Sequence, residues 1–355
     1  MAAGTGRLAP SPTGQLHLGH ARSFLLAWWH ARSRGGRIVL RIEDLDVERV
    51  KPGMIDATRA DLEWLGLDWD GELWTQSEHA EAFDEAVQQL LARGLAYPCV
   101  CTRKEIAEAQ SAPHGESVVP PGPAAGPNPD HSSTRAARVS MTPAGSSPDR
   151  GASLPSAPGE PPRYPGTCRG KYASLADARR ATGRDPAVRL LVQPGRLELV
   201  DEFAGSFSLD VHADVGDFPV ARRAGAVAYQ LAVVVDDARQ AVGEVVRGDD
   251  LLPSAARQWL VQEALGLPHP RWWHVPLVTD EHGRRLAKRS DDLSLARIRA
   301  ASIDPRALVA WVARRSGIEA REPGSARDFA PGFDMTRVPR EPVRCGREAL
   351  AELGL

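Results

Sequence analysis

Lysine is scarce in this chain of 355 residues, because only four of its 44 lysine and arginine residues are lysines. A lysine that stands inside a motif, as Lys288 does, is therefore more informative than usual. Positive and negative charges nearly cancel, and the formal net charge of −2 excludes a uniformly basic coat for nucleic acid. A local basic face is still compatible with this composition.

The sequence also lacks any run of about 18 apolar residues, the length of a membrane span, and its start does not resemble a signal peptide. We therefore expect a cytoplasmic protein with no membrane partner. In that compartment cysteines are expected as thiols or metal ligands rather than disulfides. The composition, 42% hydrophobic and 25% charged, predicts a globular chain of two or three domains. The four cysteines are Cys99, Cys101, Cys168 and Cys345.

A stretch near the start joins turn-forming residues to an apolar helix. It reads Arg7-Leu-Ala-Pro-Ser-Pro-Thr-Gly-Gln-Leu-His17-Leu-Gly19-His20, and the apolar residues 21–29 follow. The unpaired N–H groups and the dipole of a helix start favour an anion, and two histidines three positions apart face the same way. This pattern predicts a phosphate site. The alternative is an ordinary junction in which the histidines only cap the helix.

The next segments predict an α/β fold with a doubly wound parallel sheet. Residues 36–46 form a β-rich apolar run that ends in acids, so a buried parallel strand would deliver Glu43 and Asp44 at its carboxyl edge. Ligands bind at that edge in open α/β sheets. Helical patterns follow over residues 53–65 and 77–93, so strands and helices alternate.

In residues 228–237, Tyr229 precedes an apolar run that ends in two acids, and this pattern predicts a helix that carries into a buried sheet segment. A strand that ends at Arg247 and a helix over residues 254–264 come next. The fork of an arginine suits a carboxylate ligand, although a solvated charge explains Arg247 equally well. The basic loop around Lys288, taken alone, is most simply a solvated turn.

The region after Cys101 predicts a metal site around a disordered loop. Residues 111–163 are rich in proline, glycine, serine and alanine, a composition that cannot bury enough apolar surface to order itself. Cys99, Cys101 and Cys168 could then form a zinc site, or they could be three unrelated reduced thiols. From the residues alone, the candidates for a fourth zinc ligand are Tyr164, His114 and His131.

Five motifs, taken together and in order, resemble class I glutamyl-tRNA synthetases, and the resemblance covers about residues 5–300 apart from the loop. It implies a Rossmann-type catalytic core split by a connective insert, with ATP held between two signatures. His17, Gly19 and His20 match the first signature, and Lys288 matches the second, which departs from the family at Arg285 and Ala287. Besides the stretch from Arg7 to His20, the motifs are Arg41-Ile-Glu-Asp-Leu-Asp46, Ala228-Tyr229-Gln-Leu-Ala-Val-Val-Val-Asp-Asp, Val246-Arg247-Gly-Asp-Asp and Arg285-Leu-Ala-Lys288-Arg.

The resemblance also implies ligands for these positions. His17, His20 and Lys288 would be the catalytic residues, and ATP is expected to bring Mg²⁺ with it. One Zn²⁺ per chain would be held by Cys99, Cys101, Tyr164 and Cys168, with no place for Cys345. The glutamate pocket would be formed by Arg7, Leu8, Ala9, Pro10, Ser11, Glu43, Tyr229 and Arg247.

The same resemblance suggests a division of the chain into four parts. The two halves of the catalytic core would span residues 1–96 and 186–275, with the zinc-binding insert at 97–185. Residues 276–355 would hold the second signature and a small helical extension that contacts the tRNA stem. The packing of residues 320–355 stays open.

About 65 residues follow the second signature, too few for the separate anticodon-binding domain of a full glutamyl-tRNA synthetase. The chain is thus similar to a truncated branch of that family. The likeness implies a monomer that activates glutamate without tRNA and transfers it to queuosine in the anticodon loop of tRNA(Asp). The alternatives are charging of a tRNA 3′ end and a non-catalytic binding paralogue.

Overall fold

The computed structural model describes residues 4–111, 139–140, 163–223, 226–284, 286, 293–346 and 351–353. Nearly all of the predicted disordered loop, with His114 and His131, therefore lies outside the described residues. Arg285, Ala287 and Lys288 of the second signature also lie outside them.

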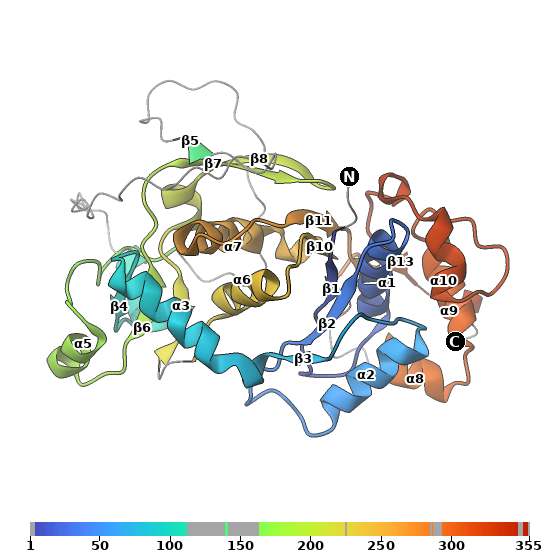
Figure 1. Cartoon of the computed structure of the whole chain (residues 1–355), viewed down its shortest axis with the longest axis horizontal. Coiled ribbons are helices and arrows are strands. Elements are labelled where there is room, and N and C mark those ends of the chain that lie inside the picture. Colours follow the sequence, from blue (N-terminus) through green and yellow to red (C-terminus); the bar gives the residue numbers. More distant parts are fainter. Residues whose placement is uncertain are drawn as a thin grey trace.

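The first part of the chain builds a parallel group of three strands that alternate with helices (Figure 1). Strands β1 (Gly6–Leu8), β2 (Ile38–Ile42) and β3 (Trp74–Thr75) pair in that order, and both pairs are parallel. All five residues of β2 are buried, as the apolar run predicted. The carboxyl ends of these strands therefore meet at one edge of the sheet.

A second parallel group comes from the later part of the chain. Strands β10 (Glu244–Gly248), β11 (Arg271–Val275) and β7 (Arg196–Asp201) are neighbours in that order. Two antiparallel strands, β8 (Gly205–Asp210) and β5 (Val139–Ser140), pair with β7.

The two groups meet where β1 and β10 begin (Figure 1). The backbone N–H groups of Gly243 and Glu244 both donate to the carbonyl oxygen of Thr5, at 3.0 and 3.1 Å. The predicted α/β fold with parallel strands is thus confirmed.

The helices expected between these strands are confirmed within a few residues. The helix after the first motif begins at its histidines, and positive-φ glycines end two others: Gly66 closes α2 and Gly266 closes α7. These helices are α1 (Leu18–Arg32), α2 (Met54–Trp64), α3 (Ala80–Ala92) and α7 (Leu252–Leu265).

One prediction of secondary structure is wrong. Residues 228–237 contain no sheet segment, because α6 (Tyr229–Arg239) is helical along its whole length. Its residues 231–237 are all buried, since the helix packs against α3, α7 and β9 (Pro219–Ala221). A helix covered on every side has no polar face, so its apolar run resembles a buried strand.

A small antiparallel sheet joins the start of the predicted connective region to strands that follow it in the chain. Strand β6 (Ala187–Leu190) lies between β4 (Ala96–Cys99) and β9. Two short helices, α4 (Arg103–Ser111) and α5 (Leu175–Thr182), accompany this sheet.

The last part of the chain packs against α1. Its helices are α8 (Leu295–Ala300), α9 (Pro305–Arg314) and α10 (Ala326–Phe329). Strand β13 (Val343–Cys345) pairs in parallel with β12 (Val278–Asp280), so residues near the end of the chain join a strand beside the second signature. Within the described ranges, none of the helices combines the length and apolar content needed to cross a membrane.

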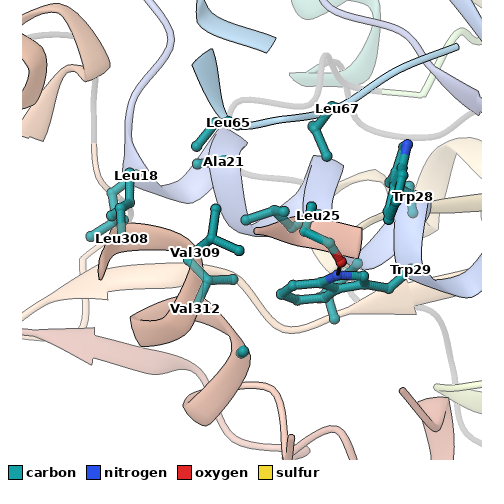
Figure 2. Packing of buried hydrophobic residues seen from close by; sticks show 14 of the residues in the cluster. Leu18, Ala21, Leu25, Trp28, Trp29, Leu65, Leu67, Leu308, Val309 and Val312 are labelled. Atoms are coloured by element: carbon teal, nitrogen blue, oxygen red, sulfur yellow. Dashed lines mark hydrogen bonds between the residues drawn. The ribbon is translucent and has the colours of Figure 1, made fainter. Parts of the chain in front are cut away.

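A shared hydrophobic core joins the helices of the last part to the start of the chain. Leu18 and Leu25 of α1 are fully buried, and Leu308, Val309 and Val312 of α9 belong to the same buried cluster (Figure 2). The indole N–H of Trp29 donates to the carbonyl oxygen of Ala326 at 2.8 Å. Helices α9 and α10 are therefore packed into the same core as α1.

Candidate active site

A cavity of about 490 Å³ opens where β1, β2 and β10 end and α1 begins. This is the carboxyl edge of the parallel strands, and the volume falls in the range of small-molecule sites. Its lining includes ten of the residues predicted for glutamate or ATP, namely Arg7, Ala9, Pro10, Ser11, His17, Gly19, His20, Glu43, Tyr229 and Arg247.

One of the predicted residues, Leu8, is not among the lining residues, and another lies in a part of the chain that the structure does not describe. Leu8 follows Arg7 in β1, so its side chain faces the opposite side of the strand, where it is fully buried in the core. Lys288 lies outside the described residues.

The two histidines cap α1, as the alternative interpretation predicted, and they also line the cavity, where a phosphate site would require them. The N–H of Gly19 donates to Nδ1 of His17 at 3.1 Å, and the N–H of His17 donates to Nδ1 of His20 at 3.2 Å. Because both Nδ1 atoms accept, each neutral ring carries its proton on Nε2. The ring centroids lie 3.8 Å apart. The pair is thus arranged as two neighbouring N–H donors.

The need for glycine at position 19 comes from the histidine beside it. An added Cβ at Gly19 would lie 3.0 Å from Cε1 of His17, which is tighter than ordinary van der Waals contact. The glycine therefore lets the ring of His17 fold back over the helix start.

A buried network of charges holds the base of the cavity. Asp237 accepts from Nε of Arg7 at 3.1 Å and from Nη1 of Arg41 at 2.7 Å, while Nη2 of Arg41 donates to Glu43 at 3.2 Å. These four side chains are at most 9% exposed. Because each charge has an opposite partner, Arg7 and Glu43 are fixed in position without solvent.

Sequence reasoning missed the structural role of Arg41 and Asp237. Both stand inside motifs, Arg41 two residues before Glu43 and Asp237 at the end of the apolar run of α6. The charge of Asp237 at the end of an apolar run signals that this residue has a buried partner. That partner, Arg41, lies 196 positions away along the chain, so the sequence pattern does not identify it.

Burial shifts the titration of the groups that face the cavity. It raises the pKa of Glu43, although Arg41 and Arg7 oppose this, and it lowers the pKa of Arg247. Burial and the nearby Glu43 raise the pKa of Tyr229, which keeps its phenol protonated. A buried site of this kind interacts strongly with a charged ligand.

Arg247 lines the cavity and has one nitrogen atom without a hydrogen-bond partner among the described residues. Its Nη2 donates to the carbonyl oxygen of Leu251 at 3.4 Å, whereas Nη1 is buried and has no hydrogen-bond partner among the described residues. An unpaired buried donor is costly, so this atom is suited to an acceptor such as a carboxylate oxygen.

The described residues just before and just after the second signature lie beside the cavity. Val278 of β12 lines the cavity on one side. On the other side, Ser294 forms a β-bridge with His17, and the N–H of Leu295 donates to the carbonyl oxygen of Leu16 at 2.8 Å.

Three cysteines form a metal-type cluster in the connective region. The Sγ atoms of Cys99, Cys101 and Cys168 all lie within 4.8 Å of one another, and Cys345 is buried elsewhere in β13. The hydroxyl of Tyr164 lies 3.4 Å from the sulfur of Cys99 and 3.5 Å from that of Cys101. A tetrahedral zinc ion with bonds of about 2.3 Å separates its ligands by about 3.8 Å, so these four side chains fit such an ion.

Arg189 supplies positive charge to this cluster. Its Nε donates to the sulfur of Cys99 at 3.2 Å, and its guanidinium carbon lies 3.9 Å from the centroid of the Tyr164 ring. The hydrogen bond with Cys168 and burial raise the pKa of the Cys99 thiol to about 12, and Arg189 opposes this shift, which favours the thiolate form that binds metal. In the described ranges, no cluster of carboxylates provides a comparable site for Mg²⁺.

The protein is similar to named synthetases along nearly its whole length. Relatives that are 35–41% identical are named glutamyl-Q tRNA(Asp) synthetase. The one from Symbiobacterium thermophilum is 40% identical, and the match covers 98% of each chain. A glutamate–tRNA ligase from Azorhizobium caulinodans is 35% identical, and that match covers 95% of this chain but 62% of the ligase.

The fold leads to the same group. A glutamate tRNA ligase from Elizabethkingia meningosepticum, solved in complex with its amino acid, superimposes with a TM-score of 0.73 at 24% identity, over 98% of this chain and 68% of that one. The family described as "tRNA synthetases class I (E and Q), catalytic domain" matches residues 5–127 and 148–352. With its parallel strands, its capping histidines and its cavity at the carboxyl edge of the sheet, the chain belongs to this family of class I tRNA synthetases.

Proposed function

We propose that this enzyme activates glutamate with ATP in the absence of tRNA and then transfers the glutamate to queuosine in the anticodon loop of tRNA(Asp). The observation that carries the proposal is the match over 98% of both chains with a relative named for this activity. The match with a glutamate–tRNA ligase extends over only 62% of the ligase. The residues of this chain thus align with nearly all of one protein and with part of the other.

Glutamate would bind between the buried charges of the cavity. It has two carboxylates and one ammonium group, and the buried residues of the cavity lining include Arg7, Arg247 and the carboxyl group of Glu43. Each charge of the ligand would then meet an opposite charge, with the phenol of Tyr229 as a further hydrogen-bonding group. Ala9, Pro10 and Ser11 would form the wall beside it.

ATP would bind beside glutamate at the start of α1. The Nε2–H groups of His17 and His20, with Gly19 and Lys288, would contact its phosphates and stabilise the charge that develops on them. An oxygen of the glutamate α-carboxylate attacks the α-phosphorus, a bond from that oxygen to phosphorus forms, and pyrophosphate leaves. Mg²⁺ would accompany the ATP and neutralise phosphate charge.

The connective region would carry one structural zinc ion. The distances among Cys99, Cys101, Cys168 and the hydroxyl of Tyr164 support this set of ligands, and Arg189 balances their charge. Such an ion would hold the two sides of the segment between Cys101 and Tyr164 together.

We keep the four-part division of the chain as part of the proposal. Residues 1–96 and 186–275 would form the catalytic core, 97–185 the zinc-binding insert, and 276–355 the second signature with the stem-contacting helices. The strands of the small sheet β4–β6–β9 come from both sides of position 186, so the insert and the core would be rigidly connected. We further propose that the enzyme is a cytoplasmic monomer.

The decisive test follows radioactive glutamate into tRNA. Label is expected on queuosine-containing tRNA(Asp), on the same tRNA after removal of its 3′-terminal adenosine, and on its isolated anticodon stem-loop. No label is expected on tRNA(Asp) without queuosine or on tRNA(Glu). Efficient labelling of tRNA(Glu) at its 3′ end would instead make the chain a glutamyl-tRNA synthetase, and no glutamate-dependent pyrophosphate exchange at all would indicate a non-catalytic paralogue.

A further inference from the structure

Three neighbouring strands deliver one polar side chain each to the same buried point behind the cavity. Arg247 of β10 stands opposite His274 in the parallel pairing of β10 with β11, and β7 lies on the other side of β11 and ends at Asp201. Nε of Arg247 lies 2.9 Å from Nε2 of His274, and Nδ1 of His274 lies 2.5 Å from Oδ2 of Asp201.

The direction of these hydrogen bonds follows from the arginine. A guanidinium group can only donate, so Nε2 of His274 must accept and the ring must carry its proton on Nδ1, which donates to Asp201. A charged imidazole would point an N–H at an N–H. Burial and the nearby Arg247 lower the pKa of His274 to about 4, which favours the neutral ring that this arrangement requires.

Asp201 is itself held in place by the backbone. Its Oδ1 accepts from the N–H groups of Phe203 and Ala204 at 3.0 and 2.6 Å, and from the N–H of His274 at 3.2 Å. Both side chains are buried, with exposures of 0% for His274 and 1% for Asp201. The carboxylate therefore has little freedom to rotate, and it fixes the ring in turn.

The consequence is a cavity-lining arginine with two of its nitrogen atoms held by partners and one left unpaired. His274 takes the Nε–H, the carbonyl of Leu251 takes Nη2, and Nη1 has no partner among the described residues although it is buried. Without the acceptor at His274, the guanidinium could rotate about its last bonds and turn Nη1 away.

We propose that Asp201 and His274 are positioning residues that hold Arg247 in the orientation that binds a carboxylate of glutamate. The inference rests on the proposed function, because it takes glutamate as the ligand of Arg247. It adds that recognition depends on two side chains that do not line the cavity and that act through the tautomer of a neutral histidine.

The experiment measures ATP–pyrophosphate exchange on the full chain with its metal, titrating glutamate at saturating ATP. His274→Leu removes the acceptor, and Asp201→Asn lets an amide donate to Nδ1, which moves the ring proton to face Arg247. Both should raise the KM for glutamate by about tenfold to a hundredfold, because a small misplacement of a binding group has effects of that size. The KM for ATP should change by less than about threefold.

His274→Gln supplies the rescue. Its amide has an oxygen for Arg247 and an NH₂ group for Asp201, so the KM for glutamate should fall back toward that of the wild type. This rescue separates orientation from packing, since Leu and Gln both differ from histidine in shape.

The matched control is a second buried histidine–carboxylate pair of the same core. His30 of α1 lies 3.1 Å from Glu244, at the other end of β10 and away from the cavity. His30→Leu should lower the melting temperature without changing the KM for glutamate.

Two outcomes would show that the positioning role is wrong while the proposed function stands. In the first, His274→Leu and Asp201→Asn fold and leave the KM for glutamate unchanged. In the second, His30→Leu raises this KM as much as they do. A wild-type enzyme without glutamate-dependent exchange would overturn both.

Discussion

At the scale of single residues, the cavity is defined by buried charges that hold one another in place. Arg7 and Arg41 share one oxygen of Asp237, and Glu43 and Arg247 are two further buried charged groups in the cavity lining. Truncation of such groups leaves a charge of the ligand without a partner, which costs more than the loss of a surface ion pair.

We expect Arg247→Ala and Glu43→Ala to raise the KM for glutamate by roughly a hundredfold, since each removes about 2–3 kcal/mol from a buried charged contact. The assay is pyrophosphate exchange with glutamate as the varied substrate. Arg49→Ala is the control, because this arginine lines the same cavity but its side chain is 67% exposed. Unchanged glutamate titrations in both main variants would contradict the pocket assignment.

Lys288→Ala should depress the rate of adenylate formation by about a hundredfold, because a cation that faces phosphate acts mainly where charge develops in the transition state. The KM for glutamate should stay within about threefold of the wild type. Replacement of Lys51, an exposed lysine outside the cavity, provides the comparison. Normal exchange in the Lys288 variant would remove this residue from the mechanism.

The neutral state of His274 also makes stability depend on pH. Its pKa is lowered to about 4, against about 6.5 in an unfolded chain, so the unfolded state binds more protons between these values. The contribution is present above pH 6.5 and is lost as the pH falls toward 4. We expect the free energy of unfolding to drop by about 2 kcal/mol more between pH 7 and 5 in the wild type than in His274→Gln. Denaturant titrations at the two pH values measure this difference, and parallel curves would argue against it.

At the scale of elements, the positions of helices and strands could be predicted from local sequence patterns. Contacts between residues that are far apart in the chain could not. The alternation of strands and helices placed Glu43 and Arg247 at the sheet edge correctly, because parallel strands end on one side. The apolar run of α6 was misassigned in part, since only tertiary contacts distinguish a fully buried helix from a buried strand. Neither Asp237 nor His274 could be assigned a partner, because their contacts join different strands and helices.

The cysteine cluster gives a prediction at this scale. Metal analysis should find about one zinc per chain, and Cys99→Ser, Cys101→Ser or Cys168→Ser should each lose it, because a structural zinc site needs four ligands. Cys345→Ser is the matched control, since that thiol is buried in β13 away from the cluster. Equal zinc content in all four variants would leave the cluster as three reduced thiols.

At the scale of the whole molecule, the segment between Cys101 and Tyr164 should be dispensable. These residues already meet in the fold, with 3.5 Å between the thiol and the phenol, so the segment closes a loop whose ends are held. Deletion of residues 113–158 also removes β5, a two-residue strand paired with β7 that carries no cysteine and no cavity residue, so the variant should retain zinc and exchange activity. Its stability should stay about the same, because a shorter loop that costs less entropy to close offsets the loss of this short pairing. Loss of zinc from this variant, measured beside the intact chain, would identify His114 or His131 as a ligand.

The pairing of β12 with β13 has a consequence for how the chain is made. Val278 pairs with Val343, 65 positions further along the chain, and this pair borders the cavity through Val278. At about 5–20 residues per second, roughly 3–13 s of synthesis separate the two strands. During that interval β12 is an unpaired edge that can recruit another nascent chain. The yield of native enzyme should therefore depend on translation speed and on chaperones that cover this edge while the ribosome completes β13.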